Sequence, residues 1–302
     1  MNLRFFTFYT NLLHSFPNTY SIPMKSIFTT TAVLLIGSAS ANAALLHLYS
    51  FNEGSGTVVT DSVGGANGTI MGDGASWISG QVSLPGGPST TAPYIDLPNG
   101  IVSSLTSATF EGWVTPTGAQ NWGRVFDFGT TEGGELNGPG GGGAGLDYIL
   151  LSLNRGTEAN TQRIEVRNES PAGGGVSTID SNAMQILGEQ FHFAVTFDAG
   201  AGAGGANVIT QYRDGAMVST GETPINLSDL DDVNNWLGRS NWTADSNSQA
   251  DYNEFRIYDS ALSAAEVSAS YSAGPTAVPE PSTVGLIALA GLGVFMRRSR
   301  KS

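Results

Sequence analysis

Two tryptophans in polar segments have the residue types that a sugar site needs. Asn121 precedes Trp122, and Asn241 precedes Trp242. A sugar ring stacks its apolar face on an exposed indole, while neighbouring amides bond its hydroxyl groups. Trp122, Trp242, Asn121 and Asn241 are therefore candidate carbohydrate-binding residues. The simpler alternative is that each tryptophan only covers an edge of the core.

Oxygen-bearing side chains also allow a calcium site, whereas the sequence has few histidines for a zinc site or a catalytic triad. The run 245–251 places an oxygen ligand at every second residue, but Ala250 and Arg256 stand where an EF-hand loop has Gly and Glu. Only His47 and His192 follow residue 43, which leaves little for a zinc site or a His-dependent triad.

Short runs of aromatic and β-branched residues between Gly, Asn and Asp clusters indicate strands over most of the chain after residue 43. They cover 45–51, 93–97, 108–114, 124–128, 148–153, 163–167, 190–197, 208–213, 235–237 and 253–258. In 190–197 large apolar residues occupy every second position, so this strand buries one face. Trp113 and Trp236 fall within such runs and are expected to be buried in the core. The predicted class is all-β.

One helix and two long loops interrupt this pattern. Ser263 and Glu266 have the spacing of a capping box, and Gly274 with Pro275 ends the helix that follows. Glycine tracts at 138–145 and 200–205 favour surface loops, because glycine loses the most backbone entropy on ordering.

The N-terminal region predicts export. Lys25, the apolar stretch 27–37 and the small residues that end at Ala43 form the charged, apolar and A-x-A pattern of a secretory signal. Residues 1–43 are therefore assigned to an N-terminal extension and signal peptide. Met24 is the expected start, and residues 1–23 are either an upstream start chosen in error or an unusually long n-region.

The segment 44–278 is long enough for one large all-β domain and is strongly acidic. It contains seven arginines, no lysine and 25 acidic residues, a formal charge of −18. A field of that sign disfavours nucleic acid and anionic membrane surfaces. The chain has no cysteine, so an exported form has no disulfide to stabilise it.

The last 24 residues combine a short motif, an apolar run and a basic end. Pro279, Glu280 and Pro281 precede the apolar run 283–296, and cations cluster in 297–301. This order resembles the PEP-CTERM sorting signal of bacteria that make exopolysaccharide. The resemblance implies processing by an exosortase-type transpeptidase and a single transmembrane helix, whose cations keep the preceding chain outside that membrane. A C-terminal core helix is the alternative.

Seven motifs occur in the order found in LamG-like, concanavalin A-type jelly-roll domains. They are LHLYSFNEGSG at 46–56, DSVGGANGT at 61–69, ATFEGWV at 108–114, FHFAVTFD at 191–198, YRDG at 212–215, LGRS at 237–240 and EFRIYDSALSAAEV at 254–267. The resemblance implies a two-sheet antiparallel jelly-roll sandwich over 44–273, followed by a linker at 274–278 and the sorting segment 279–302. It places five apolar residues in the core: Phe51, Phe110, Phe193, Phe255 and Ile257.

The same resemblance implies a structural calcium ion near the first and last strands. The candidate ligands are Glu53, Asp61, Asn67, Asn253 and Glu254. Asn253 stands where the family commonly has Asp, which removes one charge from the site. The alternative is that these residues are solvated turn side chains.

Laminarinase-like glycoside hydrolases share this fold and carry their two catalytic carboxylates on one E-x-D-x-x-E strand. That motif is absent, and the nearest stretch, 165–169, has Arg167 in place of the middle carboxylate and is interpreted as a solvated strand end. We therefore expect a non-catalytic protein, sorted to the cell surface or biofilm matrix, that associates with extracellular carbohydrate. The alternatives are a glycoside hydrolase on the same fold and a structural matrix protein without a specific ligand.

Overall fold

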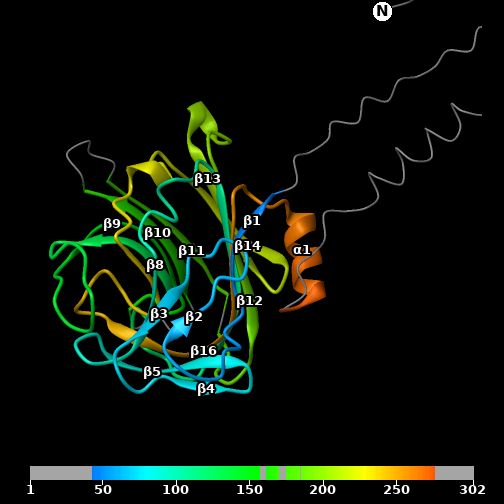
Figure 1. Cartoon of the computed structure of the whole chain (residues 1–302). Coiled ribbons are helices and arrows are strands. Elements are labelled where there is room, and N and C mark those ends of the chain that lie inside the picture. Colours follow the sequence, from blue (N-terminus) through cyan, green and yellow to red (C-terminus); the bar gives the residue numbers. More distant parts are fainter. Residues whose placement is uncertain (1–42, 157–160, 170–174, 184, 276–302) are drawn as a thin grey trace, which may run out of the picture. The chain divides into compact units, whose positions relative to one another are not determined.

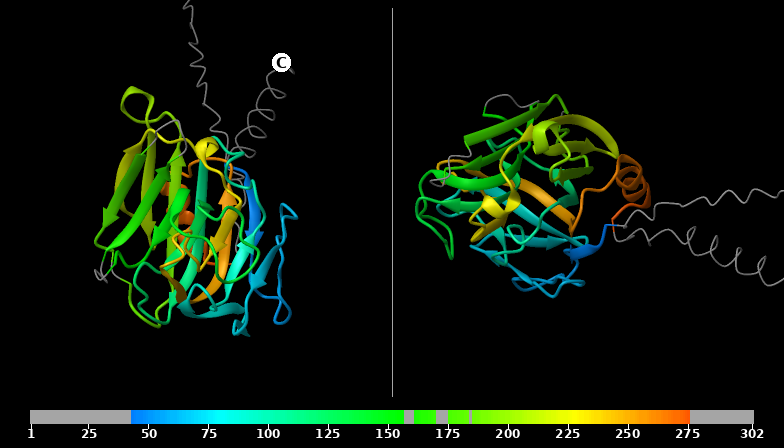
Figure 2. Two further views of the ribbon diagram at one scale, coloured as in Figure 1. Left: turned by 90° about the vertical axis from the view of Figure 1, so that its left-hand side faces the viewer. Right: turned by 90° about the horizontal axis from the view of Figure 1, so that it is seen from above.

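The computed structural model describes residues 43–156, 161–169, 175–183 and 185–275. Within these ranges the chain forms two antiparallel sheets of eight strands each, stacked face to face (Figures 1 and 2). The predicted all-β sandwich is therefore confirmed. Almost all of the predicted signal segment and all of the sorting segment lie outside the described residues, and no described helix is long and apolar enough to cross a membrane.

Sheet A has the strand order β14-β13-β12-β7-β16-β5-β4, and β1 also pairs with β16. Its strands are β1 (Leu45–Tyr49), β4 (Ser76–Ile78), β5 (Gln81–Pro88), β7 (Ala108–Pro116), β12 (Phe191–Asp198), β13 (Asn207–Arg213), β14 (Ala216–Thr223) and β16 (Ser246–Tyr258). The long strand β16 pairs with β5 through its first half and with β1 through its second half.

Sheet B has the strand order β11-β10-β9-β8-β15-β6-β3-β2. Its strands are β2 (Val58–Val59), β3 (Gly68–Met71), β6 (Tyr94–Leu97), β8 (Arg124–Thr131), β9 (Gly145–Ser152), β10 (Gln162–Asn168), β11 (Gly175–Ser181) and β15 (Asn234–Leu237). The late strand β15 inserts between β8 and β6, which brings the loop that follows it next to the loop that precedes β8.

Aromatic side chains from both sheets meet between them. Phe110 of β7 lies 5.3 Å from Phe126 of β8, and Phe128 lies 5.9 Å from Phe255 of β16, measured between ring centroids. Burying each such ring stabilises the fold by about 1.5–3 kcal/mol. The predicted core set is confirmed, since each of its five members is at most 1% exposed.

Strand residues that alternate with these core positions point to the two outer faces of the sandwich. Trp113 and Trp236 are buried as expected, but they pack on these outer faces and not between the sheets. The guanidinium of Arg256 lies 4.7 Å from the Trp113 ring, and that of Arg239 lies 4.3 Å from the Trp236 ring. Each outer face therefore has its own layer of aromatic and charged side chains.

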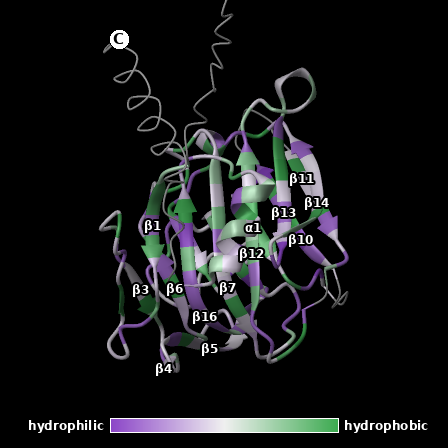
Figure 3. Ribbon diagram, turned by 90° about the vertical axis from the view of Figure 1, so that its right-hand side faces the viewer, coloured by the Kyte–Doolittle hydropathy of each residue, from purple (hydrophilic) through white to green (hydrophobic). Residues whose placement is uncertain are grey.

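A single described α-helix, α1 (Ala264–Ala273), covers part of the outer face of sheet A (Figure 3). Its predicted capping box is confirmed: the Glu266 amide donates to Ser263 Oγ at 3.3 Å, and the Ser263 amide donates to Glu266 Oε2 at 2.7 Å. The glycine tract 200–205 includes the short 3-10 helix η1 (Ala203–Gly205), which composition did not predict. A second 3-10 helix is η2 (Leu227–Asp229).

Candidate functional site

Both predicted sugar-stacking tryptophans line one cavity of about 310 Å³ on the outer face of sheet B. The lining residues are Trp122, Arg124, Arg163, Glu165, Trp242 and Asp245. Trp122 comes from the loop before β8, and Trp242 and Asp245 come from the loop between β15 and β16. The insertion of β15 beside β8 is thus what brings the two tryptophans together, although they are far apart in the sequence.

Trp122 is half-buried and has a left-handed backbone, with φ of 57°. Residues other than glycine adopt this conformation only where neighbouring groups hold them, and such positions cluster at functional sites. Here the Trp122 amide donates to the Asn154 carbonyl at 3.0 Å, and the Trp122 carbonyl accepts from Arg124. The guanidinium carbons of Arg124 and Arg163 lie 5.4 and 5.8 Å from the indole ring centroid.

Trp242 is also half-buried, and hydrogen bonds fix its ring. The indole Nε1 donates to Tyr148 Oη at 2.9 Å, and Tyr148 Oη donates to Glu165 Oε1 at 2.7 Å. The guanidinium carbon of Arg167 lies 5.2 Å from the Trp242 ring centroid. An aromatic side chain held in this way loses little further entropy when a ligand stacks on it.

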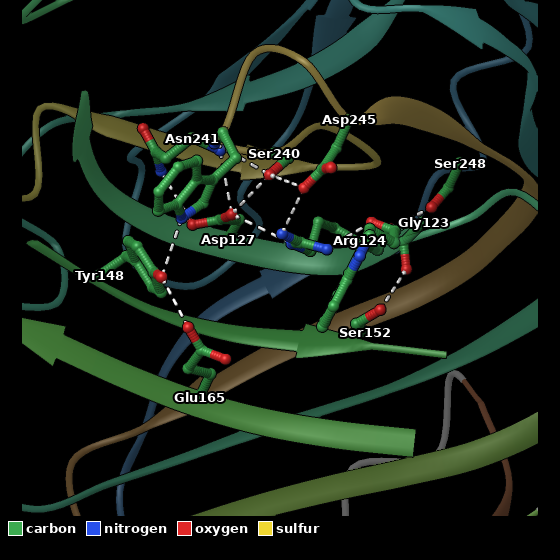
Figure 4. A network of polar contacts seen from close by, with 12 residues as sticks. Gly123, Arg124, Asp127, Tyr148, Ser152, Glu165, Ser240, Asn241, Asp245 and Ser248 are labelled. Atoms are coloured by element: carbon green, nitrogen blue, oxygen red, sulfur yellow. Dashed lines mark hydrogen bonds and ion pairs between the residues drawn. The ribbon is translucent and has the colours of Figure 1, made fainter. Parts of the chain in front are cut away.

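A buried polar network beneath the cavity anchors both loops (Figure 4). Asp127 Oδ2 accepts from the Asn241 amide at 2.9 Å, and Asp127 Oδ1 accepts from Asn241 Nδ2 at 2.9 Å. Arg124 donates to Asp127 Oδ2 at 3.3 Å and to Asp245 Oδ2 at 2.8 Å. One arginine therefore links β8 to the loop that carries Trp242.

Burial dominates the electrostatics of this network. It raises the pKa of Asp127 to about 6, although the charge of Arg124 and the hydrogen bonds from Asn241 oppose the shift. Burial also raises the pKa of Asp245, against the same arginine. Both carboxyl groups are thus costly to ionise, and Arg124 is what offsets that cost.

Neither predicted asparagine lines the cavity beside its neighbouring tryptophan. Asn241 is fully buried, and its amide bonds Asp127 and Asn234. It therefore positions Trp242 and does not offer its amide to a ligand, which corrects our expectation of direct sugar contact. Asn121 is exposed but lies outside the cavity lining.

Four polar residues of the cavity were not predicted to contact a sugar: Arg124, Arg163, Glu165 and Asp245. Glu165 lies in the middle of β10, where the sequence had indicated a solvated strand end. Asp245 bonds Arg124 and Ser240, and the remainder of the run 245–251 lies in strand β16, so the run does not form an EF-hand-like loop. The alternation of charges at 163, 165 and 167 was the available signal, because it places three charged side chains on one face of a strand.

Three of the predicted calcium ligands lie together around β2 and are already hydrogen-bonded. Asp61 accepts from His47 Nδ1 at 2.7 Å and from several backbone amides, Asn67 Oδ1 accepts from the Asp61 amide at 2.9 Å, and Glu53 Oε1 accepts from the Thr60 amide at 2.6 Å. Most side-chain oxygens of this group therefore serve the turn itself, whereas Glu53 Oε2 is buried without a hydrogen-bond partner among the described residues.

The other two predicted ligands, Asn253 and Glu254, lie on β16, and Glu254 accepts from Arg256 Nε at 2.6 Å beneath α1. Within the described ranges no three His, Cys, Asp or Glu side chains form a group that could hold a metal ion. The structure does not assemble the five residues into one centre, and calcium binding stays a prediction.

The cavity combines two indole rings with two arginines and two carboxylates, so the formal charges of its wall cancel. Both arginines are ion-paired: Arg163 contacts Glu165 at 3.2 Å and Asp180 at 2.7 Å, and Arg124 bonds Asp245. Such a wall offers apolar platforms beside fixed hydrogen-bonding groups of both kinds. It suits a neutral ligand that has many hydroxyl groups.

A family profile described as the concanavalin A-like lectin/glucanases superfamily matches residues 89–268, more than half of the chain. The chain belongs to this superfamily. A second profile, the PEP-CTERM protein-sorting motif, matches residues 277–301. This motif implies export through the membrane to the bacterial cell surface and processing by an exosortase. No curated protein sequence matches the chain.

One solved structure with a similar fold contains a bound oligosaccharide. Domain 4 of AbnA, an extracellular arabinanase from Geobacillus stearothermophilus in complex with arabinotriose, is 20% identical over 75% of this chain and 98% of that domain, with a TM-score of 0.55. The CBM40 of the Ruminococcus gnavus IT-sialidase, bound to α2,3 sialyllactose, is 18% identical over 63% of this chain and 95% of that one, with a TM-score of 0.49.

A toxin structure shows the same architecture within a longer chain. Botulinum neurotoxin type C, whose cell entry depends on interaction with two ganglioside molecules, is 11% identical over 76% of this chain, with a TM-score of 0.51. This chain spans about half of that structure's length, 51%. At such low identities the two matches with a TM-score above 0.5 show the shared fold alone.

Proposed function

We propose that this concanavalin A-like protein is a non-catalytic, exported carbohydrate-binding protein, and that the cavity between Trp122 and Trp242 holds a neutral sugar. The observation that carries the proposal is the convergence of these two half-buried indoles on one charge-balanced cavity. The fold it shares with an arabinotriose-bound domain supports the same ligand class.

The polar wall supports binding without catalysis. A retaining glycosidase needs two carboxyl groups about 5 Å apart, one of which keeps a proton to donate. Glu165 instead accepts hydrogen bonds from Tyr148 and Arg163, and Asp245 is bonded to Arg124. Both carboxylates are thus committed to holding the wall in place, which suits hydroxyl recognition better than proton transfer.

The sorting signal indicates where this binding would matter. Export to the cell surface places the domain among extracellular polysaccharides, and its acidic, lysine-free surface stays soluble there. We therefore propose that the protein either attaches to extracellular polysaccharide of the matrix or holds that polysaccharide at the cell surface.

A glycan array probed with the full chain tests the proposal. We expect binding to neutral oligosaccharides that falls about tenfold or more, ~1.4 kcal/mol, in Trp122→Ala and in Trp242→Ala. Trp77→Ala is the matched control, because Trp77 is also half-buried but lies in β4 of sheet A, donates to the Gly56 carbonyl and lines no part of the cavity. Its array profile should equal that of the wild type.

Three results would overturn the proposal. A flat array, or equal losses in all three tryptophan variants, would remove the sugar site. Release of reducing sugar from a bound polysaccharide, abolished by Glu165→Gln, would establish a glycoside hydrolase in place of a binding protein.

A further inference from the structure

A second cavity, of about 450 Å³, lies on the outer face of sheet A where α1 ends. Trp113, Gln190, His192, Asp214 and Tyr271 line it together with the residues at the end of the helix. Figure 3 shows α1 crossing this face over β12. The cavity therefore lies on the opposite side of the sandwich from the one between Trp122 and Trp242.

A buried histidine in the lining has one ring nitrogen without a partner. His192 is fully buried, and its Nε2 lies 2.8 Å from Glu111 Oε1. Glu111 also accepts from Tyr258 Oη at 2.9 Å and from Arg256 at 3.3 Å, so it is an acceptor only and Nε2 of His192 carries the hydrogen. Among the described residues nothing bonds His192 Nδ1, which is left as a buried acceptor.

An unpaired buried acceptor costs free energy, and natural proteins rarely keep one without a reason. His192 is held between two rings of the same cavity, with centroids 4.8 Å from Trp113 and 5.6 Å from Tyr271. Tyr271 is 42% exposed and stands on the last turn of α1, so it forms the accessible wall above the imidazole. A donor that enters beside Tyr271 would satisfy Nδ1.

A tight turn fixes the second polar group of the cavity. Asp214 and Gly215 connect β13 to β14 with φ of 50° and 76°, the two positive values that a type I′ hairpin turn requires. Asp214 Oδ1 accepts from the His192 amide at 2.9 Å, while its side chain stays 46% exposed. Tyr271 packs against Gly215, where a Cβ atom would lie 2.9 Å from the tyrosine ring.

The free polar groups, His192 Nδ1 and the outer edge of Asp214, both accept hydrogen bonds, and an exposed phenol ring stands beside them. Hydroxyl groups and ammonium groups both donate. Arg213 Nε lies 3.7 Å from the Asp214 carboxylate, and Arg256 contacts Glu111 at 3.3 Å and Glu254 at 2.5 Å, so each of these carboxylates already has an arginine partner. Neutral hydroxyl groups are therefore favoured over a cation.

We propose that this cavity is a second carbohydrate site, in which a neutral sugar ring stacks on Tyr271 and donates hydroxyl hydrogens to His192 Nδ1 and Asp214. The sugar class rests on the proposed function, whereas the site itself rests on its own residues. Two sites on opposite faces allow one molecule to bridge two polysaccharide chains, and bridging converts weak single contacts into strong retention.

Indole NMR signals separate the two sites, because the chain has five tryptophans and each cavity has its own. The full chain is titrated with arabinotriose, laminaritriose and cellotriose. We expect saturable shifts of the Trp113 signal that persist in the Trp122→Ala, Trp242→Ala double variant. Tyr271→Ala should weaken the Trp113-reported affinity about tenfold or more, whereas Tyr271→Phe keeps the ring and the affinity.

Asp214→Asn provides a second variant that keeps the fold, since Asn tolerates positive φ and can still accept from the His192 amide. It should weaken binding at Trp113 and leave the Trp122 and Trp242 shifts unchanged. Shifts at Trp122 and Trp242 alone would overturn the second site and leave the proposed function standing. Shifts at Trp113 alone would overturn the sugar site between Trp122 and Trp242 and leave the second site standing. The absence of a shift with all three sugars would overturn both sites.

Discussion

On the outer face of sheet A, Glu111, Glu254 and Arg256 are at most 1% exposed beneath and beside α1. On the outer face of sheet B, the side chains of Arg163 and Glu165 keep 14% and 15% of their surface exposed beside the tryptophan cavity. Both faces carry arginine–carboxylate pairs and aromatic rings. The first face is closed by a helix, and the second is bordered by loops that leave a cavity.

This difference shows how one fold assigns two roles to similar residues. A charge that is removed from water must find all its partners inside the protein, so the covered face holds a nearly complete internal network. A charge that keeps part of its surface can exchange water for ligand hydroxyl groups at low cost. Structural roles therefore belong under α1, and binding roles belong at its edge and on sheet B.

Arg256→Leu should have the largest effect, because it leaves Glu111 and Glu254 buried without their cation. We expect a loss of about 3–5 kcal/mol in the free energy of unfolding, measured by urea denaturation. Arg167→Leu is the matched control on the open face, where the ion pair with Glu169 is partly exposed, and it should cost less than about 1 kcal/mol. Equal losses in both variants would contradict the distinction between the faces.

Asn241→Ala tests the buried polar network beneath the sheet B cavity. It removes three hydrogen bonds, from Asn241 Nδ2 to Asp127 Oδ1 and to the Asn234 carbonyl and from Asn234 Nδ2 to Asn241 Oδ1, and should cost about 2 kcal/mol in unfolding free energy. Sugar affinity should fall as well, because the loop that carries Trp242 loses its anchor. Asn121→Ala, at an exposed position, should change neither quantity, and a binding loss in that variant would return Asn121 to the ligand site.

Much of the fold was predictable from local pattern. The ordered motifs and the Ser263 capping box each depend on residues close in sequence, and both are confirmed. The alternation around Phe193 correctly places its large apolar residues in the core, but the prediction of a single buried face was wrong, because His192, Ala194 and Thr196 on the other face are buried too. The 3-10 helix at 203–205 was missed because glycine content predicts only the average entropy cost of ordering a segment. The shape of this turn depends on its particular hydrogen bonds, which composition does not predict.

The site was predictable only in part, because sheet order is a long-range property. The two tryptophans stood out by type, but nothing local shows that β15 lies beside β8. Without that neighbour relation Arg124 and Asp127 look like ordinary strand residues, and Asn241 looks like a ligand contact. The same limit applies to His192, since its partner Glu111 comes from a neighbouring strand with no signal in the sequence around it.

Acid should act in opposite directions on the two faces. The pKa of Asp127 is raised from 3.8 to about 6 by burial, so its contribution to stability is complete below pH 3.8 and is lost as pH rises through about 6. On the covered face burial alone would raise the pKa of Glu111, but His192 and Arg256 lower it overall, so its contribution is lost only as pH falls through that depressed value.

Between about pH 8 and about pH 5, therefore, the open face should gain about 1 kcal/mol from Asp127 while Glu111 contributes no change. Asp96, another sheet B carboxyl whose pKa burial raises to about 6, should add to this gain. Urea midpoints measured across that range test the sign, and Asp96→Asn should reduce the rise. A midpoint that falls steadily from pH 8 to pH 5 would contradict these assignments.

Ser263→Ala should have the smallest effect, and it tests the helix that makes the two faces different. Losing the cap costs about 1 kcal/mol, because the Glu266 amide then has no side-chain acceptor at the helix start. Ser272→Ala in the same helix removes only a bond from Ser272 Oγ to the Ser268 carbonyl at an exposed site, so it should be neutral or slightly stabilising. Because α1 covers Glu111 and His192, the Ser263 variant should also speed hydrogen exchange of the Trp113 indole while leaving Trp242 unchanged. Faster exchange at both tryptophans would mean that the two faces open together, and the helix would then be a part of the global fold and not a separate cover.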